Sequence, residues 1–121
     1  MNTLSTLKTA LILLLTLGFL AGCAQPNPHP MDMTAAVQSA KTPTDHLALA
    51  NHYQQAAQDA QAQVEEHKKL LAEYQAKSYL YGKQAATWQA HCQALIYHYQ
   101  QIVDANRQMA DMHRKMAEAA H

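Results

Sequence analysis

Four side chains near the carboxyl end of the chain have the types and spacing of a soft-metal site. Met112, His113 and Met116 follow Met109 by three, four and seven positions, which places them along one side of a helix. Thioether ligands select Cu(I), and imidazole also binds copper. Methionines at this spacing more often fill a hydrophobic interface. The pattern therefore leaves two interpretations, copper binding or resistance on the one hand and packing on the other.

Histidine pairs offer a second kind of metal site. His67 and His98 are expected almost opposite one another across two helices, and His91 and His98 lie seven residues apart on one face. Imidazole suits Zn²⁺ and Cu²⁺. Neither pair has an obvious carboxylate to complete a tight ligand shell, so solvated or phenol-bonded histidines are the default interpretation.

The chain has two cysteines, Cys23 and Cys92. Adjacent positions on a helix diverge by about 100°, so His91 and Cys92 are not expected to share one metal. Cys92 is either a buried structural thiol, which we favour, or an intermolecular contact with a second chain. We find no serine nucleophile motif, phosphate-binding glycine loop or pair of catalytic acids, and expect no enzyme.

The other cysteine ends a segment built like a secretory signal. Lys8 is followed by an uncharged apolar run and then by Leu20-Ala21-Gly22-Cys23. At about a dozen residues the run is shorter than the ~20 that a membrane-spanning helix needs. These four residues match the lipobox, and residues 1–23 resemble the precursors of bacterial lipoproteins.

The resemblance implies that residues 1–22 are a cleaved signal peptide and that Cys23 carries the lipid, diacylglycerol with fatty acyl chains such as palmitate. Two or more chains suffice for stable attachment to a membrane. Ala24, rather than Asp, would favour the outer membrane on its periplasmic side. In plan, the whole chain is similar to the small helical envelope lipoproteins of Gram-negative bacteria.

Prolines and glycines divide the remainder. All four prolines lie before residue 44, so we interpret residues 23–43 as a tether, with room for a short helix near residues 33–40. Thr42-Pro43-Thr44-Asp45 has the cap, proline and acid of a helix start. Residues 44–121 are predicted to form two helices, about 44–81 and 84–120, that fold back at Gly82 as an antiparallel hairpin.

Apolar residues recur every three and four positions along both helices, as in a coiled coil. We predict that residues whose numbers sum to about 166 face each other, which brings Tyr53 to His113 and His67 to Tyr99 in phenol–imidazole hydrogen bonds. The first helix should contribute to the seam His46, Ala50, Tyr53, Ala57, Ala60, Val64, His67, Leu71, Tyr74, Ser78 and Tyr81. The second should contribute Ala85, Trp88, Cys92, Leu95, Tyr99, Ile102, Asn106, Met109, His113, Met116 and Ala120.

A two-helix hairpin buries little surface, and further apolar residues widen its face beyond the seam. We therefore expect an all-α protein in which two hairpins pair into a four-helix bundle, or one hairpin packs on another envelope protein. An extended monomer is the remaining alternative. Nine Lys and Arg balance nine Asp and Glu, so nothing favours nucleic acid as a partner. Apart from the lipid, Cu or Zn is the only cofactor that the residues suggest.

Overall fold

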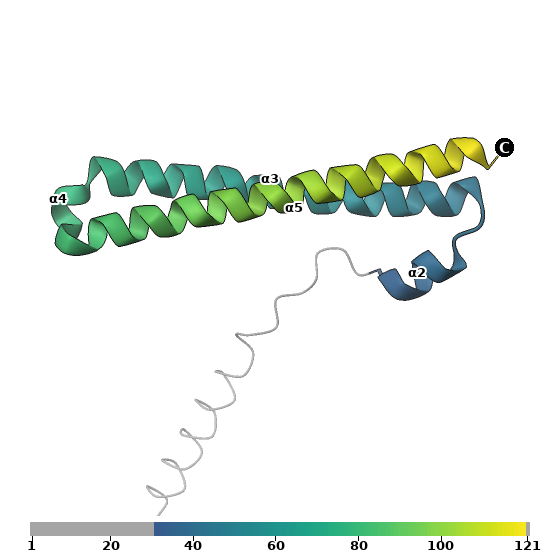
Figure 1. Cartoon of the computed structure of the whole chain (residues 1–121), viewed down its shortest axis with the longest axis horizontal. Coiled ribbons are helices and arrows are strands. Elements are labelled where there is room, and N and C mark those ends of the chain that lie inside the picture. The colour runs from purple at the N-terminus through teal and green to yellow at the C-terminus, as the bar shows by residue number, and fades with distance from the viewer. Residues whose placement is uncertain (1–30, 121) are drawn as a thin grey trace, which may run out of the picture. The chain divides into compact units, whose positions relative to one another are not determined.

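A computed structural model describes residues 31–120, and in this range the chain is helical, without strands. The elements in order are α2 (Met33–Ser39), α3 (Pro43–Ala76), α4 (Ser78–Tyr81), a 3₁₀ turn (Gly82–Gln84) and α5 (Ala85–Ala119). The long helices α3 and α5 lie side by side and antiparallel, with α4 at the closed end and α2 beside the open end (Figure 1). The predicted signal peptide and the predicted lipidation site, Cys23, lie outside the described residues.

The start of α3 is fixed by its sequence, as predicted. Thr42 Oγ1 accepts a hydrogen bond of 3.2 Å from the Asp45 amide, and Asp45 Oδ2 accepts one of 2.9 Å from the Thr42 amide. This reciprocal capping box satisfies amides that have no partner inside the helix. The Lys41 and Thr42 amides, in that order, hold the pKa of Asp45 below its usual range. Pro43 occupies the first turn, where its missing N–H costs nothing.

The first long helix was predicted to run unbroken over about 44–81, but it is interrupted near the closed end. α3 ends at Ala76, Lys77 leaves the helical conformation with φ −110° and ψ 25°, and α4 adds one further turn. Gly82 then takes φ 52° and ψ −131°, a conformation that side chains disfavour. The reversal that the sequence predicts at Gly82 therefore occurs there.

The seam of α3 is the predicted one along most of its length. Leu49 joins it, while the predicted Ser78 is exposed. Ala60 and Val64 pack with Val103 of α5 in a cluster extended by Ile96 and Tyr99.

On α5 the predicted seam was wrong at Ile102 and Met116. Val103, Ala110 and Ala117 are buried, whereas Ile102 is 45% exposed and Met116 42% exposed. Small side chains, Ala110 and Ala117, therefore occupy the seam in the last turns of α5. Alanines on both helices let the two backbones approach closely, and the larger Ile102 and Met116 lie beside the seam.

Candidate functional site

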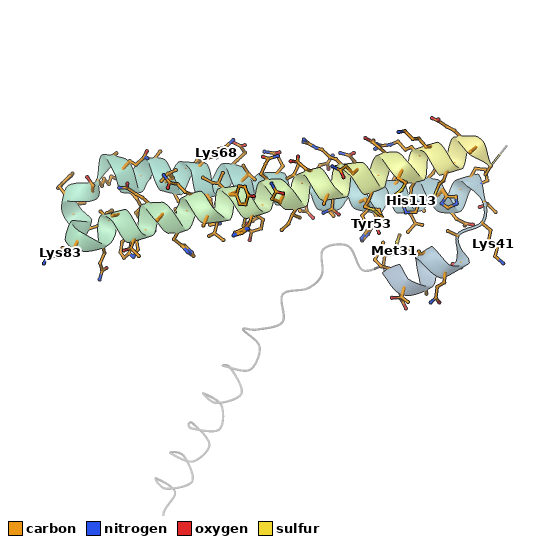
Figure 2. The ribbon with its side chains drawn as sticks, in the orientation of Figure 1. Met31, Lys41, Tyr53, Lys68, Lys83 and His113 are labelled. Carbon is orange, nitrogen blue, oxygen red and sulfur yellow. The ribbon has the colours of Figure 1, made fainter. Side chains whose placement is uncertain are left out.

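The most tightly organised polar group lies near the open end of the hairpin. The His113 ring of α5 lies close to two rings of α3, those of His46 and Tyr53, with nearly parallel planes (Figure 2 labels Tyr53 and His113). Ring centroids are 5.4 Å apart for His46–His113 and 5.7 Å apart for Tyr53–His113. His46 and Tyr53 are seven residues apart on α3, so both border the space that receives His113.

His113 is the buried polar residue of this group, with 6% of its surface exposed. Its Nδ1 lies 3.2 Å from Nδ1 of His46, a distance that fits one N–H···N hydrogen bond. Burial first, and the nearby His46 second, hold the pKa of His113 below its usual range. The neutral form of His113 is therefore favoured, and the hydrogen bond needs one donating and one accepting nitrogen.

The predicted neighbours are thus confirmed, but not the predicted hydrogen bonds. Tyr53 meets His113 face to face, with ring planes 7° apart, and His113 bonds to His46 instead. His67 and Tyr99 are likewise stacked, with ring centroids 5.7 Å apart and planes at 13°. Nδ1 of His67 is buried without a hydrogen-bond partner among residues 31–120. Among the described residues, no hydrogen bond joins the hydroxyl of Tyr53 to His113 or that of Tyr99 to His67.

A groove of about 330 Å³ opens toward the closed end of the hairpin. Residues of both long helices line it, and they include aromatic, aliphatic, imidazole and thiol side chains. Its lining residues are His67, Leu70, Tyr74, Trp88, His91 and Cys92. Sequence reasoning missed this grouping because His91 and Cys92 point apart on one helix, yet both border the same wide groove.

Aromatic rings close the hairpin beyond the groove. Trp88 packs on Tyr74 and Tyr81, with ring centroids 5.3 and 4.9 Å apart. Tyr79 and Leu80 of α4 are strongly exposed at this end. The tip therefore has a packed aromatic interior and an apolar outer surface.

The structure distributes the candidate metal ligands over several surfaces. His113 is buried in the seam, whereas Met112 is 45% exposed, Met116 is 42% exposed and Met109 is half-buried. His67 stacks on Tyr99, while His98 is exposed beside the ring of Tyr97. Within residues 31–120 no three or more His, Cys, Asp or Glu side chains lie close enough to hold one metal ion.

Cys92 is buried, with 2% of its surface exposed, and carries a free thiol. A disulfide to a second chain needs an accessible sulfur. This burial favours the structural thiol over the intermolecular contact.

The two sides of the seam differ in character. On one side the long polar residues of both helices meet, and Arg114 donates hydrogen bonds to Gln54 of α3 (3.0 Å) and to Asp111 (2.6 Å). We call this the polar flank; by helical position it holds Gln54, Gln61, Lys68, Gln93, Gln100, Arg107 and Arg114. Leu47, which lies seven positions before Gln54, is an exposed apolar residue at the open-end limit of this polar flank.

The opposite side, which we call the apolar flank, is lined by Ala56, Gln63, Leu70, Trp88, Leu95, Ile102, Met109, Met112 and Met116. Leu70 and Trp88 from the two helices meet in the groove described above, which locates both on this flank. Near the open end, α2 lies beside Ala48 and Leu49 and covers only that part. The remaining apolar flank has no cover from residues 31–120.

None of the helices in the described part of the chain is long and apolar enough to cross a membrane. Comparison with known proteins found no matching family model, no matching curated protein and no matching solved structure.

Proposed function

We propose that this chain is a structural or interaction protein of the bacterial cell envelope, anchored by lipid on Cys23, whose hairpin pairs with a second copy into a four-helix bundle. The observation that carries the pairing is the uncovered apolar flank. Ile102, Met112 and Met116 are each more than two-fifths exposed there, opposite a flank of Gln, Lys and Arg. Contiguous apolar surface of this kind marks an interaction site.

The dimensions of the flank suit a second hairpin. α3 has 34 residues, which span about 50 Å at ~1.5 Å per residue. Two neighbouring helices of ~10 Å diameter give a face of roughly 1,000 Å², above the ~800 Å² that each partner buries in a standard interface. A second copy offers the same apolar composition, as a two-fold symmetric contact requires.

The anchor rests on the lipobox sequence. Lipid attachment at Cys23, followed by a proline-containing tether, would hold the hairpin at the periplasmic face of a membrane, with the outer membrane favoured by Ala24. Two copies on one membrane surface would pair with their tethers at the same end. In this proposal the methionines contribute packing surface rather than copper ligands.

The pairing is tested by placing charge on the apolar flank. In the lipidated protein extracted in detergent, Ile102→Glu together with Met116→Glu should convert dimers to monomers in sedimentation velocity. Gln101→Glu together with Gln108→Glu adds the same charge at exposed positions on the back of α5, and should leave the dimer intact. A monomeric parent protein, or equal dissociation in both double variants, would overturn the proposal.

The anchor has its own matched pair of variants. Cys23→Ala should abolish incorporation of labelled palmitate, while Cys92→Ala should retain it. Equal labelling of the two variants would contradict Cys23 as the lipidated residue.

A further inference from the structure

His46 and His113 present two imidazole nitrogens to each other across the open end of the hairpin. Their Nδ1 atoms lie 3.2 Å apart, although one belongs to the first turns of α3 and the other to the last turns of α5. Tyr53 stacks on His113 and so restricts the orientation of its ring. The two nitrogens are therefore held close together by the fold.

This separation matches the geometry of a metal site. Zinc–nitrogen bonds of about 2.05 Å at a tetrahedral angle place two ligand nitrogens about 3.3 Å apart. We propose that His46 and His113 bind a late first-row divalent ion, Zn²⁺ or Cu²⁺, through their Nδ1 atoms and thereby clamp the ends of α3 and α5 together.

The proton balance is simple. In the neutral pair, one ring carries its proton on Nδ1 and donates it to the Nδ1 lone pair of the other. Metal binding moves that proton through solvent to Nε2 of the same ring, so both Nδ1 lone pairs face the ion and no net proton is released. A pair that also holds an extra proton releases it.

The surroundings determine the strength of the site. Asp45 is held by the amides of Lys41 and Thr42, and Arg114 is engaged by Asp111 and Gln54. Two imidazoles thus bind the ion, and water reaches the remaining positions because His46 is only half-buried. The expected affinity is that of a two-ligand site, with Cu²⁺ bound more tightly than Zn²⁺.

The site lies within one chain and is independent of the proposed pairing. Its test uses the lipidated protein extracted in detergent, stripped with EDTA and then dialysed. Thermal unfolding is followed by circular dichroism at pH 7.5 with Zn²⁺, Cu²⁺ or Mg²⁺. Zn²⁺ and Cu²⁺ should raise Tm by several degrees, because the ion binds the folded state selectively, whereas Mg²⁺ should not.

His46→Gln should remove this Tm shift, and His67→Gln, which alters the other stacked histidine, should preserve it. A shift that survives His46→Gln, or no shift in the parent protein, overturns the proposal. A second measurement needs no variant. In ¹⁵N spectra of the parent protein, substoichiometric Zn²⁺ should move the Nδ1 resonances of His46 and His113 before those of other histidines, and early shifts at other histidines alone would contradict the site.

Discussion

Nδ1 of His46 and Nδ1 of His113 lie 3.2 Å apart, and this contact joins the first turns of α3 to the last turns of α5. The ring of His113 is also stacked on Tyr53, so a single buried side chain of α5 contacts two rings of α3. The open end of the hairpin, which no loop closes, is therefore held in part by a hydrogen bond between two imidazoles.

The stability of the hairpin should depend on pH through His113. Burial and His46 lower its pKa in the folded state, so in acid the unfolded chain binds a proton more readily than the folded chain does. The contribution of neutral His113 to stability is complete at pH values above the pKa of a histidine in the unfolded chain, near 6.5. This contribution is lost as the pH falls below that pKa. The urea concentration at the unfolding midpoint, measured in the presence of EDTA, should decrease as the pH is lowered from 7.5 to 5.

His113→Gln should flatten this pH dependence, whereas His98→Gln, at an exposed position, should retain it. An unchanged slope in His113→Gln would show that other groups dominate the acid response.

The corrected seam predicts a sharp contrast between two neighbouring positions. Val103 is fully buried against Ala60 and Val64, so Val103→Ala should lower the free energy of unfolding by about 2 kcal/mol through lost burial and a cavity. Ile102→Ala removes a larger side chain, but from the surface of the hairpin. Chemical denaturation of the pairing-deficient Ile102→Glu, Met116→Glu background should isolate the Val103→Ala effect. In the parent, Ile102→Ala should chiefly weaken pairing. If Val103→Ala had no effect on stability, the seam predicted from the sequence, with Ile102 in place of Val103, would be favoured.

The capping box should be measurable at Thr42. Thr42→Ala removes the acceptor for the Asp45 amide and should cost about 1 kcal/mol, a typical value for a lost helix cap. Thr44→Ala, inside the same first turn and exposed, is the matched control and should change stability little. Equal losses in the two variants, measured by urea unfolding, would argue against the cap.

Gly82 should resist substitution for conformational reasons alone. A Cβ there would meet no atom within 4 Å, but φ 52° with ψ −131° is strained for other residues. Gly82→Ala should therefore destabilise the hairpin by about 1–3 kcal/mol, whereas Lys83→Ala should be nearly neutral. A neutral Gly82→Ala variant in thermal unfolding would mean that the turn relaxes into another conformation.

Much of this architecture could be predicted because the apolar periodicity of the helices agrees with the positions of the residues that start helices or form turns. Thr42, Pro43 and Asp45 mark the start of α3, and Gly82 marks the reversal. The prediction that the numbers of facing residues sum to about 166, here called the facing rule, paired Tyr53 with His113 and His67 with Tyr99, as observed. These features follow from local sequence and from one antiparallel register.

The errors arose where several side chains compete for one space. Spacing alone does not distinguish Ile102 from Val103 as the residue that follows Tyr99 in the seam; the close approach of alanine-lined helices decides it. The pair of His46 and His113 was missed because the facing rule matches one residue with one, whereas a side chain in a helical interface enters a space bordered by four. The seven-residue spacing of His46 and Tyr53 around that space was the available signal.

Pairing of two lipid-anchored hairpins can be measured by native mass spectrometry of the membrane-extracted protein, released from detergent micelles. We expect a complex of two chains, each beginning at Cys23 and carrying its acyl chains. A single chain, a complex with a different protein, or a Cys23 without lipid would overturn the proposed function.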